Sequence, residues 1–219
     1  MARLTWDDAG KRFYETGVDQ GVLYVMNEGT TYGTGVAWNG LTAVTESPSG
    51  AEATPLWADN GKYLTMISAE EFGATVEAYT YPPEFGVCNG EAELGAGVSI
   101  GQQGRKTFAL CYRTISGNDT EGDDYGYKIH IIYGCKAAPS EKAYATKNDS
   151  PEAITFSWEI TTTPVSVTGM KPTAYVCIDS KTVGSANMKK IEDKLYGTSA
   201  EGVPTLLLPD EIKALIHLV

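Results

Sequence analysis

The stretch Ile154-Thr-Phe156-Ser-Trp158-Glu-Ile160 places a large apolar side chain at every second position and a polar one between them. Because successive side chains of a β-strand point to opposite faces, this alternation predicts a strand with one buried face. Four further runs rich in β-branched and aromatic residues also predict strands. These runs are residues 75–81, 105–113, 127–133 and 173–178. The sequence therefore predicts a mainly β fold with at least five strands.

Turn-forming residues separate the predicted strands. They are Asn39-Gly40, Asn60-Gly61, Asn89-Gly90 and the cluster Ser116-Gly-Asn-Asp119. Residues of these types tolerate the positive φ angles that tight turns require. We therefore expect antiparallel hairpins to connect much of the sheet.

Helical periodicity is confined mainly to the C-terminal part of the chain. Ser185 is suited to cap a helix that carries Met188, Ile191 and Leu195 on one face, and Gly197 is placed to end it. This pattern predicts one amphipathic helix after the last strand.

A second, shorter helix is expected to begin at Pro209, which suits a first helical position. Asp210 and Glu211 follow, where the positive end of the helix dipole favours acidic side chains. Its apolar stripe would consist of Ile212, Leu215 and Ile216. We expect this helix to pack on its own domain or on a neighbour.

The chain shows no solenoid-type repeat and no low-complexity tract. The economical domain organisation is a single β-rich domain over residues 21–198. An N-terminal arm over residues 1–20 would precede it, and a C-terminal extension over residues 199–219 would hold the short helix.

Acidic residues outnumber basic ones, 28 against 17, which gives a formal net charge of -11. This balance opposes broad attraction to nucleic acid or to an anionic membrane. The sequence has no apolar run of about 18 residues, the minimum for a membrane-spanning helix, and its N-terminus turns acidic at Asp7. We therefore expect the protein to be made and kept in a cytoplasm.

The sequence offers no clear cofactor site. Trp38 stands where a dinucleotide fingerprint beginning at Gly33 would need its third glycine. The four cysteines, which are scattered without a CxxC pair, disfavour a zinc site or a disulfide framework. They are Cys88, Cys111, Cys135 and Cys177.

Two other features of the sequence bear on possible chemistry. Asn118-Asp-Thr-Glu121-Gly-Asp123-Asp124 gathers four carboxylates, and we favour a solvated hairpin tip over a weak cation site because the spacing does not match calcium-binding loops. His130 lies between apolar residues of a predicted strand without a nucleophile motif, which favours a structural role. We expect no catalytic residue, no cofactor and no metal.

Glu46-Ser-Pro-Ser-Gly-Ala-Glu-Ala-Thr-Pro55 is a long polar connection between predicted strands. Such segments are usually mobile loops or partner-binding ones. A β-rich chain with polar loops and no catalytic constellation fits a protein that associates with copies of itself, since pairing between subunits is one way to cover sheet edges.

Several long blocks resemble the major tail proteins of long-tailed bacteriophages of Gram-positive hosts. The first is Trp6-Asp-Asp-Ala-Gly-Lys-Arg-Phe-Tyr14-Glu-Thr-Gly-Val-Asp-Gln-Gly-Val-Leu-Tyr24. Later blocks are Tyr32-Gly-Thr-Gly-Val-Ala-Trp-Asn-Gly-Leu-Thr42, Glu46-Ser-Pro-Ser-Gly-Ala-Glu52, Ala69-Glu-Glu-Phe-Gly-Ala-Thr-Val-Glu-Ala-Tyr-Thr-Tyr-Pro82, Gly101-Gln-Gln103, Leu110-Cys-Tyr-Arg113, Ala138-Pro-Ser-Glu-Lys142 and Asn148-Asp-Ser-Pro-Glu-Ala-Ile-Thr-Phe-Ser-Trp-Glu159. The similarity extends to about residue 180.

The resemblance implies the tail tube fold, a β-sandwich or partly closed barrel with a flanking helix. It implies a homo-hexameric ring whose inner strands line a β-barrel, and stacking of rings into a hollow tube in the virion tail. Tail terminator and distal tail proteins would be partners, and the tape measure protein and transiting DNA would occupy the lumen without specific binding. A negative lumen would let DNA pass without adhering.

The resemblance also suggests which segments join neighbouring rings. By position, residues 46–60 match the loop that reaches an adjacent ring, with Trp57 as an apolar anchor. The residues expected in this stacking loop are Glu46, Ser47, Pro48, Ser49, Gly50, Glu52 and Trp57. The N-terminal arm would add contacts through Trp6, Phe13 and Tyr14.

Two alternatives remain at this point. The chain could be another β-rich virion protein, such as a tail terminator, a head–tail joining protein or a capsid decoration protein, which would not polymerise. It could also be a β-sandwich hydrolase or carbohydrate-binding module that stacks sugars on Tyr79, Tyr81 or Trp57, although core packing is the favoured role for most of these aromatics.

Overall fold

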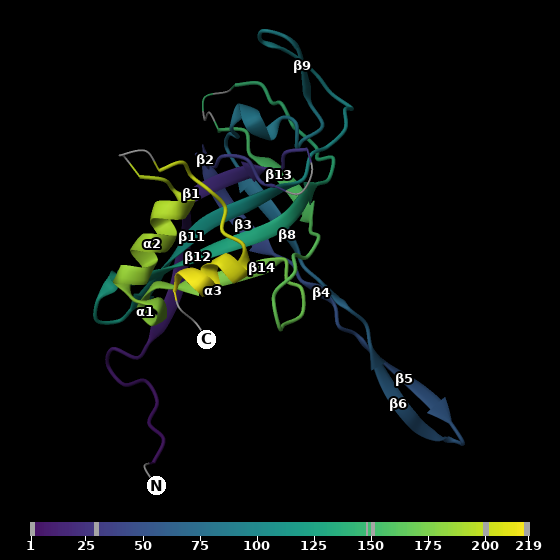
Figure 1. Ribbon diagram of the computed structural model, residues 1–219, viewed down its shortest axis with the longest axis vertical. Coiled ribbons are helices and arrows are strands. Elements are labelled where there is room, and N and C mark those ends of the chain that lie inside the picture. The colour runs from purple at the N-terminus through teal and green to yellow at the C-terminus, as the bar shows by residue number, and fades with distance from the viewer. Residues whose placement is uncertain (1–2, 29–30, 148, 150–151, 199–201, 217–219) are drawn as a thin grey trace.

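Antiparallel strands dominate the computed structural model, which describes residues 3–28, 31–147, 149, 152–198 and 202–216 (Figure 1). The strands are β1 (Phe13–Val25), β2 (Val36–Trp38), β3 (Leu41–Glu46), β4 (Ser49–Gly50), β5 (Ala53–Ala58), β6 (Gly61–Ile67), β7 (Glu70–Glu71), β8 (Gly73–Ala78), β9 (Ala92–Gly95), β10 (Val98–Ile100), β11 (Phe108–Asn118), β12 (Gly122–Ala137), β13 (Phe156–Thr161) and β14 (Tyr175–Asp179). The helices are α1 (Ser180–Val183), α2 (Ser185–Leu195), α3 (Pro209–Leu215) and a 3-10 turn at Pro83–Phe85. The predicted mainly β class is confirmed.

The strands of the body form two layers. A large sheet runs β2-β1-β11-β12, with β14 beside β12, and a small sheet runs β3-β8-β13. The two sheets are continuous at one corner, where Lys136 and Ala137 of β12 pair with Thr161 and Ile160 of β13. The sheets do not close into a barrel within the described part of the chain.

Aromatic side chains fill the space between the two sheets. The Trp38 and Trp158 rings lie 5.7 Å apart edge to face, and Phe85 lies 5.1 Å from Trp158. Leu23, Val76 and other fully buried side chains complete this first core. Edge-to-face contacts of this kind add to the stabilisation that burial provides.

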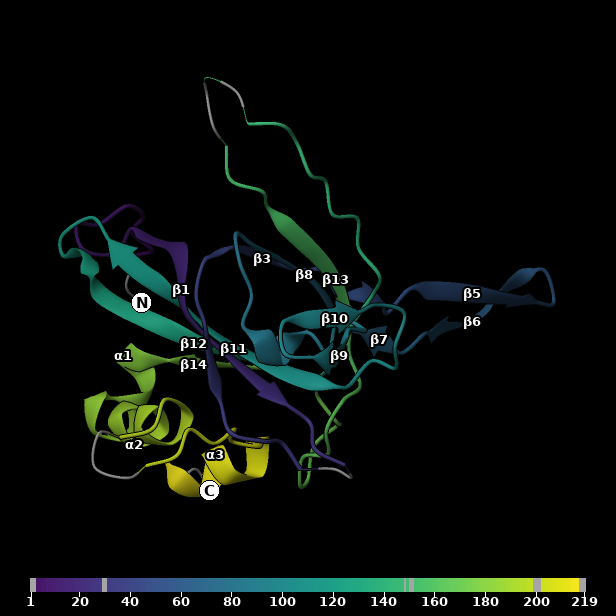
Figure 2. The same ribbon diagram turned by 90° about the horizontal axis from the view of Figure 1, so that it is seen from above.

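The opposite face of the large sheet carries a second core beneath the helices (Figure 2). Met188, Ile191 and Leu195 of α2 are buried there, as predicted. The C-terminal segment also belongs to this core, because Leu206, Leu207 and Ile212 are buried in it. The final helix thus packs on its own domain, which is one of the two arrangements expected from the sequence.

Local details of the helices and turns differ from expectation. Gly184, rather than Ser185, stands at the N-cap of α2 and provides no side-chain cap. Asp179 instead caps α1 by accepting from the backbone N–H groups of Lys181 and Thr182. Asn39-Gly40 does not close a hairpin, because it carries the chain from β2 in one sheet to β3 in the other.

The free N-terminal arm is shorter than the predicted residues 1–20. Strand β1 begins at Phe13, where pairing with Asn118 of β11 starts, so Phe13 and Tyr14 lie on the strand. The polar connection from Glu46 to Pro55 also contains strand residues, namely β4 and the first half of β5.

Candidate assembly interface

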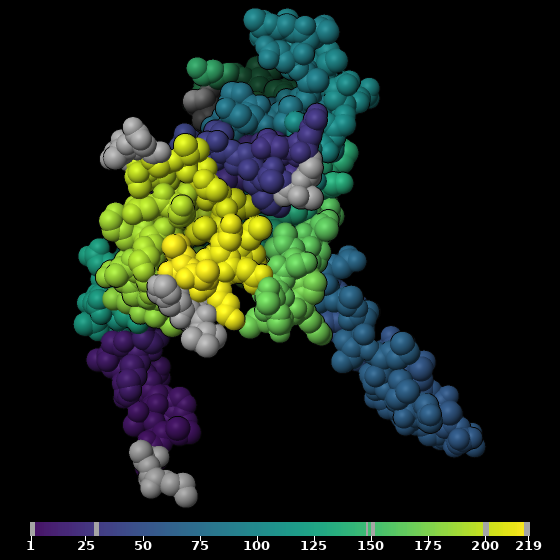
Figure 3. All heavy atoms as spheres, viewed as in Figure 1, coloured from purple at the N-terminus to yellow at the C-terminus, as the bar shows by residue number. Residues whose placement is uncertain are grey.

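A long β-hairpin, β5 and β6, projects away from the body (Figures 1 and 3). The short ladder of β4 with β7 forms its base. At its tip the residues Asp59 and Asn60 have φ angles of 49° and 62°, as a two-residue hairpin turn of the primed type requires. Every residue of β5 and β6 is exposed, so this hairpin lacks a core of its own.

The projecting hairpin is nevertheless rich in apolar side chains. Trp57 is 69% exposed and Tyr63 is 71% exposed. The other large apolar side chains exposed on it are Leu56, Leu64, Met66 and Ile67. Contiguous exposed apolar surface on a folded protein usually marks an interaction site.

The expected stacking residues lie along the segment that leads into this hairpin and, for Trp57, on its first strand. Glu46 ends β3 at the root, Ser47 and Pro48 follow it, and Ser49 and Gly50 form β4. Glu52 lies just before β5, and its backbone N–H donates to Ser68 Oγ. Trp57 lies near the tip.

Sequence reasoning missed the second strand of the hairpin and with it Tyr63, Leu64, Met66 and Ile67. The signal was present, because Asn60-Gly61 lies between two runs of equal length, residues 53–58 and 62–67.

Both roots of the hairpin contact one group of side chains, in which His130 lies 2.7 Å from the hydroxyl of Tyr175 of β14. At one root, Tyr112 donates a 2.7 Å hydrogen bond to Glu46 Oε1, and Glu46 also lies 3.6 Å from His130. At the other root, the ring of Phe72 stacks on the Tyr175 ring with centroids 4.9 Å apart. These contacts fix the direction in which the hairpin leaves the body.

His130 is the centre of this root cluster, and its side chain is only 6% exposed. Thr114 donates its hydroxyl proton to Glu15 Oε1, so it accepts from His130 Nε2 at 2.8 Å. His130 Nδ1, 2.7 Å from the Tyr175 hydroxyl, is then free to accept from it. The neutral imidazole is thus satisfied at both nitrogens.

Burial lowers the pKa of His130, although the Glu46 and Glu15 carboxylates act in the opposite direction. Burial also opposes ionisation of Glu15, but hydrogen bonds from Lys128 and Thr114 leave its pKa below the usual value. The cluster therefore holds a neutral histidine beside two carboxylates. The position agrees with the structural role expected from sequence.

The N-terminal arm, residues 3–12, also projects from the body (Figure 3). The side chain of Trp6 on this arm is exposed. The acidic loop holds the end of this arm. Asp119 Oδ1 accepts from the backbone N–H of Gly10 at 3.0 Å, and Tyr14 donates to Asp123 Oδ1 at 2.7 Å. Within the described residues, no group of three or more His, Cys, Asp or Glu side chains is arranged to hold a metal ion.

The large sheet has open edges in the described structure. β2 pairs with β1 only at Gly21–Leu23, so residues 13–20 of β1 have no strand on that side. β14 forms the opposite edge and pairs only with β12 in the part of the chain described. Open edges present unpaired backbone groups to which another strand can be added.

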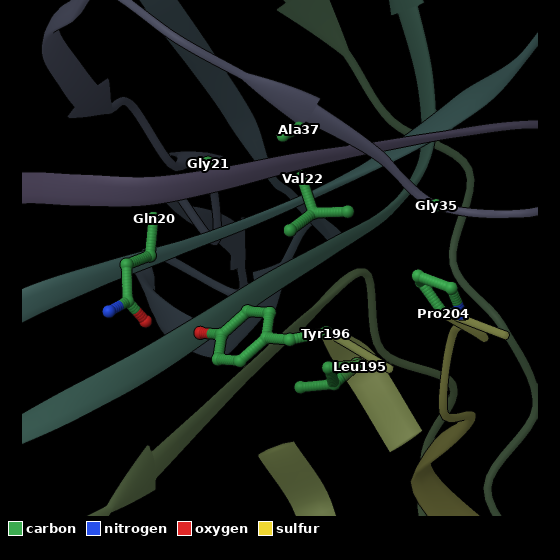
Figure 4. A pocket seen from close by; sticks show the side chains of 8 residues that line it. All are labelled: Gln20, Gly21, Val22, Gly35, Ala37, Leu195, Tyr196 and Pro204. Carbon is green, nitrogen blue, oxygen red and sulfur yellow. The ribbon is translucent and has the colours of Figure 1, made fainter. Parts of the chain in front are cut away.

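An apolar hollow of about 370 Å³ lies beside the β1 edge (Figure 4). It is formed where β1 and β2 face the C-terminal end of α2. Its lining consists of Gln20, Gly21, Val22, Gly35, Ala37, Leu195, Tyr196 and Pro204.

The three aromatics considered for sugar stacking do not form one platform. Trp57 lies near the hairpin tip, whereas Tyr81 contacts the aromatic core, 5.4 Å from Trp158. Tyr79 is exposed on the body beside Gly40, whose backbone C=O accepts from its N–H.

A comparison of the sequence with protein-family models finds no matching family, and no curated protein matches it. The described helices include none with the length and apolar character needed to cross a membrane.

Proposed function

We propose that this protein is a major tail protein of a long-tailed bacteriophage. Copies of the chain assemble into hexameric rings, and the rings stack into the hollow tail tube through which DNA is ejected. The observation that carries the proposal is the projecting β5–β6 hairpin, whose apolar side chains have no partner in the described part of the chain.

The hairpin supports polymerisation because it extends far beyond the surface of its own body (Figures 1 and 2). A contact made by such a projection on a different surface of the next copy is heterologous. Heterologous contacts continue from copy to copy unless a rotation closes them. Stacking of rings through this hairpin would therefore give a tube rather than a pair of rings.

The open edges of the large sheet support lateral association within a ring. The outer edge of β1 and the outer edge of β14 are the two opposite edges of the same sheet. Pairing of one edge with the other on a neighbouring copy would continue the sheet and leave neither edge exposed. The six-fold number comes from the sequence resemblance, as do the tail terminator, distal tail and tape measure partners.

The net charge of -11 agrees with a passage for DNA that does not adhere to the wall. Under this proposal the protein is made in the host cytoplasm and ends in the virion tail. It needs no cofactor, because its work is mechanical and not chemical.

The test is negative-stain electron microscopy of the purified protein over a concentration series. We expect hollow tubes or stacked six-fold rings. The matched variant replaces Ala53–Ile67 by Asn-Gly, so that Glu52 and Ser68, which pair at the base, are joined by a short turn. This variant should fold and form at most single rings.

The outcomes separate the candidates. Wild-type rings that never stack would favour a tail terminator, joining or decoration protein instead. Particles that stay monomeric at all concentrations, also when mixed with preformed tail tips, would refute the proposal. Tubes formed equally well by the shortened variant would remove the hairpin from stacking.

A further inference from the structure

We propose that the β5–β6 hairpin is held between two other copies of this chain, each covering one face of the ribbon. The inference rests on the proposed function and goes further, because it specifies the number of copies that receive one hairpin. A hairpin that merely lay on one neighbour would need only one apolar face.

The strand register defines one face of the ribbon. Leu56 lies opposite Leu64, and Thr54 lies opposite Met66. Directly opposed residues of an antiparallel pair place their side chains on the same face. We call this the leucine face. On it, Leu64 is 41% exposed and Met66 is 58% exposed.

The other face carries the alternate residues. Ala53 lies opposite Ile67 and Pro55 opposite Thr65, and Trp57 follows Leu56, so its side chain points away from the leucine face. We call this the tryptophan face. On it, Trp57 is 69% exposed and Ile67 is 70% exposed. Both faces of the ribbon are therefore apolar and both are open to solvent.

The amount of exposed surface is that of an interface. Even without Tyr63, the other five large apolar side chains of the ribbon expose on the order of 600 Å² together, near the roughly 800 Å² that each partner contributes to a standard interface. These five are Leu56, Trp57, Leu64, Met66 and Ile67. An isolated two-stranded ribbon is marginal in water. If one partner covered one face, about half of this apolar surface would remain in water.

Two copies of this chain that lie side by side would form an apolar groove between them, and an apolar hairpin could bind in this groove. The apolar hollow is bordered by Gln20 and Gly21, which lie where the uncovered edge of β1 meets β2. A lateral neighbour that pairs with this edge would add a second wall beside the hollow. Figures 1 and 2 place α2, which lines the hollow, on the side of the body away from the hairpin, as a head-to-tail contact requires.

The first test changes one face at a time. Leu56→Thr with Leu64→Thr alters the leucine face, and Trp57→Thr with Ile67→Thr alters the tryptophan face, while threonine keeps the preference for strands. We expect each pair to raise the critical concentration for tube formation by more than about tenfold. If either pair leaves that concentration unchanged, only one face is covered and the inference is wrong.

The second test counts the copies around one hairpin. A photoreactive p-benzoylphenylalanine is placed at Leu56, at Trp57, or at both, in a tagged chain that is a small minority among unlabelled wild-type chains. These neighbours lie at the same height on opposite faces. Single labels should give two-chain products, and the double label should give three-chain products.

The results also distinguish the two proposals. Two-chain products alone from the double label, with both single labels reactive, would overturn the inference and leave the tube intact. Failure of unlabelled wild-type protein to assemble would refute the proposed function, and the inference with it.

Discussion

Two hairpins of this protein are apolar on both faces but differ in what covers those faces. The central hairpin, β11 and β12, is apolar on both faces: Leu110 faces the small sheet, whereas Ala109 faces the helices. The projecting hairpin, β5 and β6, is also apolar on both faces but is exposed throughout. The central hairpin shows that a ribbon of this kind is stable when a layer lies on each side. The comparison suggests that the projecting one needs the same cover from other molecules.

The largest effect is expected in the covered region. Trp158→Ala should lower the free energy of unfolding of the monomer by about 3–5 kcal/mol, because it leaves a cavity among Trp38, Phe85 and Tyr81. Urea denaturation of dilute protein measures it. A loss below about 1 kcal/mol would mean that the aromatic core is not closely packed.

A smaller effect is expected where the projecting hairpin joins the body. Tyr112→Phe removes the hydrogen bond to Glu46 and should cost about 1 kcal/mol in the same assay. Tyr79→Phe, at an exposed tyrosine, is the control and should change nothing measurable. Equal values for the two variants would contradict the contact at the root.

The root cluster should also make stability depend on pH. His130 has a lowered pKa when folded, so the unfolded chain binds its proton first as the pH falls. The contribution of neutral His130 to the free energy of unfolding is complete above about pH 6.5 and is lost as the pH falls below that value. His130→Gln should therefore lose less stability than wild type between about pH 7 and pH 5. Parallel pH profiles of the melting temperature would show that His130 does not titrate differently on folding.

The smallest effect is expected on the exposed ribbon of the monomer. Trp57→Ala should change its unfolding free energy by less than about 0.5 kcal/mol, since this side chain contacts no core. Hydrogen exchange provides a second measurement. The backbone amides of β5 and β6 should exchange fast in dilute monomer and slowly in assembled protein, whereas those of β11 and β12 should exchange slowly in both. A large cost in the monomer would show that the hairpin folds back onto the body.

The sequence predicted those elements whose two sides differ in environment. Trp158 and Ile160 are buried on β13, between exposed Glu159 and Thr161, so the period of two is visible. Met188, Ile191 and Leu195 mark the buried face of α2 in the same way. In such elements one surface meets water and the other meets protein.

The projecting hairpin escaped prediction because it lacks this asymmetry. Pro55-Leu-Trp57 and Tyr63-Leu-Thr-Met-Ile67 place apolar residues on both faces, which erases alternation, and Ser47 to Glu52 resembles a loop. The crossing at Asn39-Gly40 was equally hidden, because a turn sequence does not say which strands its neighbours pair with.

The candidate assembly interface was predicted only in part for a related reason. Trp57 and the residues before it were identified by position along the chain, but the second strand was not. The cluster around His130 joins strands that are far apart in sequence, β1, β3, β11 and β14. Contacts of that kind depend on sheet order, which local patterns do not contain.

The root of the projecting hairpin has a mechanical consequence. β6 has seven residues, about 23 Å of strand, so a rotation of about 10° at the root would displace the tip by roughly 4 Å. The hairpin is thus a lever whose pivot is the group of side chains at Tyr175. A stiff pivot would give a straight, rigid polymer. A flexible pivot would let neighbouring rings tilt relative to each other while each hairpin tip stays bound to the adjacent ring. The bending stiffness of the assembled polymer would then be set by a few contacts inside each subunit, remote from the surfaces that join one subunit to the next.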